Sequence, residues 1–533
     1  MKLSRDDLFR AGLLFLAIFI AHANFLFPAI AENPDSNFIY PFISSIHSFT
    51  EYISKLVTLE TIDFQPVRDL TLFVDVWFQN HFQLNVSIFL NCLIWGISCW
   101  EILEIIDRYI RVVDKKTSLF VVACYAVYPI FLQTINWGIS RKHLLAFMFI
   151  LLATRAFLEW METHKGRLKM IVFYTLSVLS LPMSIGWPVW CFCYLWLKDK
   201  KKLKESVKPL IFLNIIMILL VLINYAYYNT SLTYLELYPK KASIISPVLI
   251  ALNLGQQVWQ LLFPYQLAFH YSFRDGAVVG VCLFIGAMIY LCWKHQHRKD
   301  VWAWLLYAGA HSAIVLSTPT LYYDTYILSP SFGLLIALLL LSGERLGKFR
   351  IFLLPCFVFW ISFTLYQNKT WGTSEDFFAN SFRHDESCNN AIGLGLAKYS
   401  GEKKIPNDLY NFIQVNTCFE PVPGDSPSLI LKKILFESMS LYYEDEIDLE
   451  YRKSRLVEMG KKHFYPLTVY AVLLSQEEND EEIETVMKRL NDSFGSSGII
   501  VGKGMPVVDR LRTYCERKEL PECRKFVRNS MEK

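Results

Sequence analysis

The most constraining feature of the chain is a series of apolar stretches, each long enough to suggest a crossing of a lipid bilayer. A helical crossing needs about 20 predominantly apolar residues, because every backbone polar group must be satisfied within the helix. We predict about 11 crossings on this criterion. They occupy residues 9–30, 84–106, 118–136, 142–160, 168–182, 184–198, 209–229, 275–293, 301–318, 322–341 and 350–367. The expected fold is a mainly α, polytopic membrane helical bundle.

Composition supports a membrane protein and argues against a nucleic-acid binder. The chain is 53% hydrophobic and 19% charged, whereas soluble domains average about 45–50% apolar and about 25% charged residues. The net charge is only +4 over 533 residues, too small for the basic surface that nucleic acid requires. The expected partners therefore include membrane lipids and no nucleic acid.

The positions of Lys and Arg predict the orientation. The loops on one side of the predicted bundle hold most of these residues, and such loops face the cytoplasm. They include Arg108, Arg111, Lys115, Lys116, Lys165, Arg167, Lys198, Lys200, Lys201, Lys202, Lys294, Arg298, Lys299, Arg345 and Lys348. The N-terminus is then inside, and an odd number of crossings puts the C-terminal tail outside. A bacterial inner membrane with a periplasmic tail fits this pattern, and the endoplasmic reticulum would fit it equally.

One apolar segment, 245–268, does not fit as a crossing. Spanning the membrane there would place the basic stretch 294–300 on the outer side, against the orientation of the other loops. We therefore expect a re-entrant or interfacial helix on the outer side. Its Gln256, Gln257 and Gln260 would then face water or protein.

Two domains are expected: a transmembrane domain over residues 1–367 and an extracytoplasmic α-helical domain over 368–533. The tail is charged, with Gly/Pro-rich turns between apolar patterns of helical spacing at 428–442, 465–476 and 480–494. Antiparallel helices of this size suit a TPR-like repeat domain. A plain helical cap is the alternative.

The cysteines divide between the two domains. Eight of the 12 lie in predicted crossings, where a thiol behaves as a small apolar group. The tail holds Cys388, Cys418, Cys515 and Cys523, and an even number in an outer domain predicts two disulfides. Three pairings are open, of which 388–418 with 515–523 is the simplest. A zinc site is not expected, because the tail has no C-x-x-C pair and no neighbouring His.

Candidate catalytic carboxylates lie in the first outer loop, residues 31–81, which is the largest insertion between crossings. A carboxylate held at the outer membrane face can act as a general base towards a hydroxyl. For any single acid, a solvated side chain or a helix cap is the alternative. The acids are Glu32, Asp35, Glu51, Glu60, Asp63, Asp69 and Asp75.

Cations gather in the outer hairpin 128–143, which ends in Arg141-Lys142-His143. Arg141 and Lys142 could bind a phosphate, Arg as a fork and Lys as a point charge. The alternative is snorkelling towards lipid headgroups.

Near the proposed re-entrant segment, His270 and Arg274 could contact an anionic leaving group or serve as interfacial anchors. Tyr326 lies in a Tyr-rich outer segment that an aromatic belt would also explain.

In order and spacing, residues 9–400 resemble the membrane half of the TPR-bearing transmembrane O-mannosyltransferase-like proteins, which have the GT-C glycosyltransferase fold. Asp35 matches an acidic position of that family's first lumenal loop, and Arg68-Asp69-Leu70-Thr71 matches its RPLT segment. Residues 128–146 match its HP…W-x-x-x-R-K-x-L-L-A stretch, and 326–333 match its RYLYLPSLG segment. The chain departs from the family pattern at Pro34, Asp69, Gln133, Leu181 and Thr325.

The resemblance implies a sugar transfer at the outer membrane face. The donor would be a sugar linked to polyprenyl phosphate, and the acceptor a hydroxyl on a protein or glycan. Asp35 would take the hydroxyl proton, while Arg141, Lys142, His270 and Arg274 would bind the leaving phosphate. Arg68, Asp69 and Tyr326 are further candidates. A divalent metal is compatible with this chemistry, but the sequence has no evident ligand cluster, and the cofactor is unspecified.

Two other functions remain open. A polysaccharide polymerase or ligase would usually have a large late outer loop, whereas the largest outer insertion here is the first. A non-catalytic membrane scaffold would use the outer helical domain to bind partners. The charged positions that differ from the family pattern keep a catalytically silent relative open as well.

Overall fold

The computed structural model describes most of the chain. The described residues are 5–22, 43, 46, 48–57, 64–84, 86–230, 247–264, 275–316, 324–348, 350–371, 373–384, 386, 388–400, 405–418, 427–443, 448–460, 464–477, 479–502, 506–518 and 520–531. Every regular element within these ranges is helical, as the sequence predicts. The helices belong to two compact units, and Ser374–Lys533 make up most of the second, which also includes the described residues 48–54.

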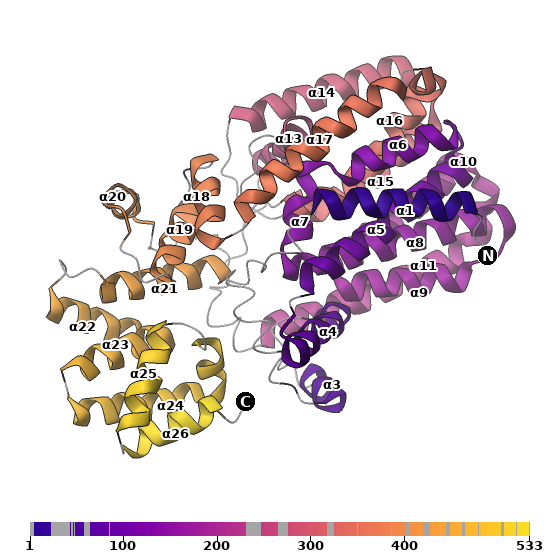
Figure 1. Ribbon diagram of the computed structural model, residues 1–533. Coiled ribbons are helices and arrows are strands. Elements are labelled where there is room, and N and C mark those ends of the chain that lie inside the picture. Colours follow the sequence, from indigo (N-terminus) through magenta and orange to yellow (C-terminus); the bar gives the residue numbers. More distant parts are fainter. Residues whose placement is uncertain are drawn as a thin grey trace. The chain divides into compact units, whose positions relative to one another are not determined.

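The first unit is a bundle of long helices (Figure 1). Its early α-helices are α1 (Arg5–Ala21), α4 (Pro66–Phe82), α5 (Ser87–Ile105), α6 (Lys115–Ala126), α7 (Leu132–Asn136), α8 (Arg141–Thr163), α9 (Arg167–Ser180), α10 (Trp187–Lys198) and α11 (Lys200–Thr230). Its later ones are α13 (Pro247–Leu262), α14 (Asp275–His295), α15 (Lys299–Leu316), α16 (Leu328–Lys348) and α17 (Leu353–Asn368).

Short turns of other helix types connect these elements. They are η2 (Ile106–Ile110, a π-helix) and the 3₁₀ turns η3 (Pro129–Phe131), η4 (Gly138–Ser140), η5 (Pro182–Gly186), η6 (Asp324–Ile327), η7 (Arg350–Phe352) and η8 (Lys369–Trp371). Helix α3 (Phe49–Val57) lies in the first outer loop predicted from the sequence.

Several helix starts follow local rules of the sequence. Asp114 caps α6, because its carboxylate accepts hydrogen bonds from the amides of Lys116 and Thr117. Pro66 occupies the first turn of α4, where a missing N–H costs nothing. At the same end of the bundle as the start of α6, Arg10 of α1 pairs with Asp107 of η2 at 2.7 Å. The sequence predicts that this end faces the cytoplasm.

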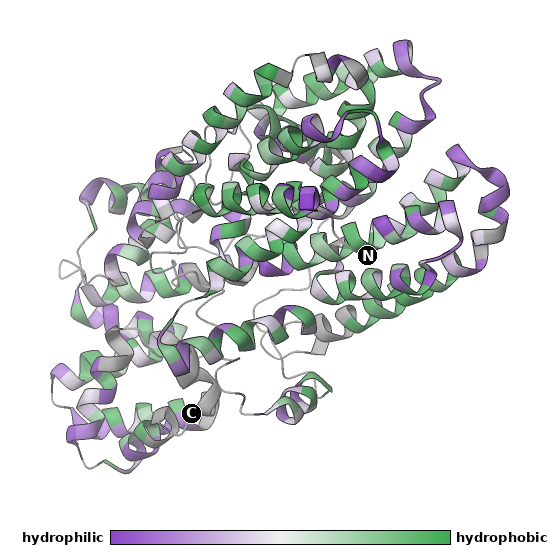
Figure 2. Cartoon of the chain, turned by 45° about the vertical axis from the view of Figure 1, so that its right-hand side comes forward, coloured by the Kyte–Doolittle hydropathy of each residue, from purple (hydrophilic) through white to green (hydrophobic). Residues whose placement is uncertain are grey.

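Apolar residues both fill the first unit and cover its outside. The interior holds Trp95, Trp187, Trp190 and Trp304 with at most 2% exposure. Hydrophobic colour runs along the lengths of the helices in Figure 2, and large apolar side chains on α14 are exposed, among them Ile285, Ile289 and Trp293. An apolar exterior of this kind is typical of helices that contact lipid.

Every predicted crossing overlaps a helix or a pair of helices, but fewer helices meet the length and hydropathy required of a span. Among the described residues three do so: Ser87–Ile110, Arg141–Thr163 and Gly276–His295. The pair Lys115–Ala126 and Pro129–Asn136, bent by 48°, could form a fourth. Helices such as α9 and α10 have 14 and 12 residues, shorter than an untilted crossing needs. The number of crossings stays a prediction.

The predicted re-entrant or interfacial segment contains α13, which packs closely and antiparallel against α14. A Cβ on Gly255 would overlap the carbonyl oxygen of Ala277, and one on Gly280 would overlap that of Gly255. Glycine is therefore required where the two backbones approach. Whether this segment is re-entrant or interfacial stays a prediction.

The second unit consists of short helices in a repeating arrangement. They are α18 (Ser374–His384), α19 (Cys388–Ser400), α20 (Asn407–Val415), α21 (Pro427–Tyr443), α22 (Leu449–Met459), α23 (Phe464–Gln476), α24 (Asp480–Gly502), α25 (Pro506–Arg517) and α26 (Pro521–Met531). The alternate helices α19, α21, α23 and α25 contact one another in sequence, and the helices between them pack on their neighbours. This stacking is typical of helical-repeat solenoids.

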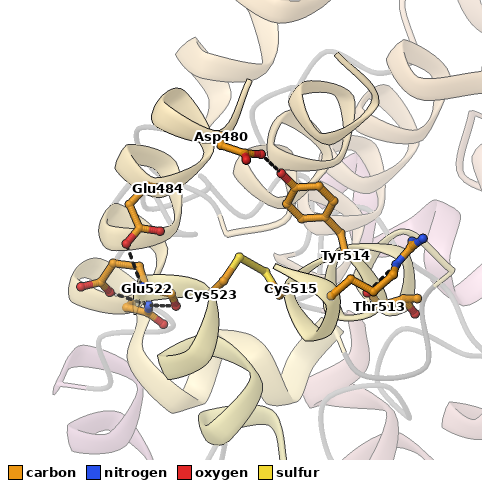
Figure 3. Close-up of a disulfide and its surroundings, with 9 residues drawn as sticks. Asp480, Glu484, Thr513, Tyr514, Cys515, Glu522 and Cys523 are labelled. Atoms are coloured by element: carbon orange, nitrogen blue, oxygen red, sulfur yellow. Dashed lines mark hydrogen bonds between the residues drawn. A yellow bond between two sulfur atoms is a disulfide. The ribbon is translucent and has the colours of Figure 1, made fainter. Parts of the chain in front are cut away.

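The tail cysteines form disulfides Cys388–Cys418 and Cys515–Cys523, the simplest of the pairings that the sequence allows. Figure 3 shows the second disulfide, with α24 hydrogen-bonded to the two following helices on either side of it. The Tyr514 hydroxyl donates to Asp480, and the Glu522 amide donates to Glu484 at 2.9 Å. The last three helices are thus fastened both covalently and by polar contacts.

Candidate functional site

Helix ends from distant parts of the chain meet at one end of the first unit. Tyr128, just after α6, donates to the carbonyl of Leu261 at the end of α13 (2.5 Å). Asn136 of α7 donates to the Asn368 side chain at the end of α17 (2.6 Å), and the Asn368 amide donates to the carbonyl of Ala21, the last residue of α1. The sequence predicts that this end faces the outer side of the membrane.

Arg141, the first residue of α8, lies at the centre of this end and has no exposed surface. Its guanidinium forms an ion pair with Asp75 of α4 (2.8 Å) and donates to the Asn91 side chain of α5 (2.8 Å). It also donates to the Thr71 carbonyl (3.1 Å) and to the carbonyl and hydroxyl of Ser87 (2.9 and 3.1 Å). We call Arg141 and these four residues the arginine clamp.

The arginine clamp joins the two regions that the sequence identified as candidate sites. Asp75 and Thr71 belong to the first outer loop, and Arg141 belongs to the cationic hairpin. Asn91 extends the connection, because its amide donates to the carbonyls of Ile135 and Trp137 within the hairpin (2.9 and 3.3 Å). The Arg141 donors are engaged by protein acceptors. This arrangement favours a structural role for Arg141 over the predicted contact with a phosphate.

Helix α4 carries its charges inward and its apolar residues outward. Arg68 is buried and pairs with Asp69 at 2.6 Å, and it also donates to Gln65 at 2.9 Å. Asp75 lies on the same buried face. The opposite face exposes 42–55% of Leu70, Val74, Trp77 and Phe82. Exposed apolar and aromatic side chains beside a candidate membrane span are typical of a helix in the membrane interface.

The remaining predicted residues fall into two groups. Lys142 is half-buried at the start of α8, and the neighbouring His143 ring meets Tyr326 of η6 edge-on, with 5.6 Å between ring centroids. The structure thus brings the hairpin and the Tyr326 segment together. Asp35, His270 and Arg274 lie outside the described residues.

Sequence reasoning did not identify Asp75 or Ser87 as partners of Arg141. A signal for Asp75 was present: Arg68, Asp69, Leu72 and Asp75 recur at helical spacing and share one face of α4. The convergence of this face with Ser87 and Arg141 is a tertiary feature that no local pattern encodes.

Within the described ranges no group of three or more His, Cys, Asp and Glu side chains is placed to hold a metal ion. No protein-family model, curated protein or solved structure matches the chain.

Proposed function

We propose that the protein is a membrane glycosyltransferase that moves a sugar from a polyprenyl-phosphate donor to a hydroxyl on a protein or glycan at the outer face of the membrane. The arginine clamp is the observation that carries this proposal. It joins α4, at the end of the predicted first outer loop, to the start of α8 in the cationic hairpin. The predicted topology would put a general base and a phosphate contact at this same membrane face.

In the proposed reaction the acceptor oxygen attacks the anomeric carbon of the donor sugar. The bond from that carbon to the phosphate oxygen breaks, and polyprenyl phosphate leaves. Asp35 accepts the hydroxyl proton. Lys142, with Arg274 and His270, stabilises the charge that develops on the leaving phosphate. Arg141 is a positioning residue, since it acts through the loop and hairpin that it joins.

The apolar outer face of α4 supports a site at the level of the lipid headgroups, where a polyprenyl donor would carry its phosphate. The two disulfides support an oxidising compartment for the second unit. A bacterial inner membrane with the second unit in the periplasm is the proposed location. The second unit would select or present the acceptor.

A partner-binding scaffold is the second candidate, favoured by the stacked helices of the second unit. Stacks of this type present extended surfaces for binding other proteins. The two functions differ in what they require of the first outer loop, because a scaffold needs no general base there.

The test measures glycan transfer in membranes that lack the protein, complemented by wild type, Asp35→Asn or Glu51→Gln. Glu51 is a half-buried acid of the same predicted loop, in α3, and serves as the control. Mass spectrometry of envelope proteins and lipid-linked glycans should show a hexose-sized adduct restored by wild type and Glu51→Gln only. Full restoration by Asp35→Asn would reject Asp35 as the base. No glycan change in any strain would reject the transferase in favour of the scaffold.

A further inference from the structure

Helix α13 presents a row of buried amides to the interior of the first unit. Asn253, Gln256, Gln257 and Gln260 are spaced by three or four residues, so they share one face of the helix. Each is at most 4% exposed. This amide face is distinct from the close contact with α14, which uses Gly255.

The three glutamines of the amide face contain buried atoms without a hydrogen-bond partner among the described residues. They are Oε1 of Gln256, Nε2 of Gln257 and Oε1 of Gln260. Buried polar atoms are almost always paired in folded proteins, because an unpaired one loses its hydrogen bonds to water without replacement. Three on one helical face therefore point to a polar molecule, either water or a ligand, bound against it.

Further unpartnered polar atoms lie on the elements around η6. Helices α7, α13, α15 and α16 all contact η6. Within the described part of these helices, Thr134 Oγ1 on α7 and His311 Nε2 on α15 are also buried and unpartnered. Tyr326 of η6 meets His143, next to the proposed phosphate contact Lys142. The amide face therefore approaches the proposed reaction site through η6.

We propose that the amide face binds the hydroxyl groups of the sugar on the lipid-linked donor. The proposal rests on the proposed function. Amides supply both donors and acceptors, which matches hydroxyl groups that do the same. Helix α13 contains no Asp, Glu, Lys or Arg, so hydrogen bonds and not ion pairs would hold the ligand on this face. Polar groups placed to bind hydroxyls also discriminate strongly against a ligand that lacks them.

The test compares the binding of two lipids by the purified full chain in detergent: polyprenyl phosphate and hexosyl polyprenyl phosphate. The triple variant Gln256→Met, Gln257→Met and Gln260→Met keeps side-chain length and removes the amides. Gln414→Met, at an exposed position of α20, is the matched control. Wild type and control should prefer the hexosyl lipid by about tenfold, since about 1.4 kcal/mol of hydrogen bonding corresponds to that factor. The triple variant should lose this preference. It should bind both lipids with the affinity that wild type has for polyprenyl phosphate.

Measuring both lipids distinguishes a misfolded variant from one that has lost only the sugar site. A misfolded variant would lose both lipids, and single glutamine variants would then replace the triple one in the same comparison. A triple variant that keeps the preference would overturn the sugar site, leave the proposed transferase intact and assign the amides to bound water. A wild type that does not bind the hexosyl lipid in preference would reject the donor itself, and the sugar site with it.

Discussion

The arginine clamp and the amide face of α13 are both buried polar clusters of the first unit, yet they differ in how fully they are satisfied. The clamp surrounds Arg141 with a carboxylate, an amide, a hydroxyl and two carbonyls. The amide face leaves atoms of Gln256, Gln257 and Gln260 without partners among the described residues. A buried cation whose nitrogens are all engaged helps to hold the fold together, whereas buried amide atoms without partners cost stability until water or a ligand pairs with them.

The largest effect is expected from breaking the clamp. In Arg141→Met, Asp75 loses its buried cation, and uncompensated buried charges typically cost about 3–5 kcal/mol. The melting temperature in detergent micelles should fall accordingly. The double variant Arg141→Met with Asp75→Asn removes both charges and should recover part of the loss. A single Arg141→Met variant that melts like wild type would show that the clamp does not fasten α4 to the hairpin.

A smaller effect, of opposite sign, is expected from the amide face. Gln257→Met removes an unpartnered buried amide and should raise the stability of the ligand-free protein by about 1 kcal/mol. The melting temperature in the absence of lipid measures this gain. Gln414→Met, which is exposed, should leave the melting temperature unchanged. A marked decrease for Gln257→Met would mean that this amide already has a structural partner.

The smallest effect is expected from an exposed polar contact of the second unit. Hydrogen bonds from Lys518 and Tyr514 lower the pKa of Asp480 below its usual value of 3.8. Because the folded pKa is the lower one, the contribution to stability is present at neutral pH and is lost as the pH falls through that folded value. Asp480→Asn should therefore melt slightly below wild type at pH 7, and the difference should shrink as the pH falls below 3.8. A difference of equal size at neutral and acidic pH would contradict the assignment.

The sequence predicts the positions of the helices better than their relation to the membrane. Apolar stretches locate α5, α8 and α14, since length and composition are local properties. The tail disulfides could also be anticipated, because four cysteines allow only three pairings. The number of crossings depends on helix tilt and on neighbouring helices, which a hydropathy pattern does not contain.

In the candidate site, too, the sequence predicts positions better than contacts. It identifies Arg141 as a candidate residue, but it does not predict the structural role of Arg141, because the partners Asp75 and Asn91 come from two other helices. The glutamines of α13 were expected to face water or protein, and they are buried. Their lack of partners depends on which side chains surround them in the folded chain. Local spacing fixes the face that a side chain occupies and says nothing of what lies opposite.

The most direct test of the contrast between the two clusters is to measure the melting temperatures of Arg141→Met and Gln257→Met side by side in the same lipid-free micelles. We expect shifts of opposite sign, with a large decrease for Arg141→Met and a small increase for Gln257→Met. Decreases of similar size in both variants would mean instead that both clusters are parts of the same structural core.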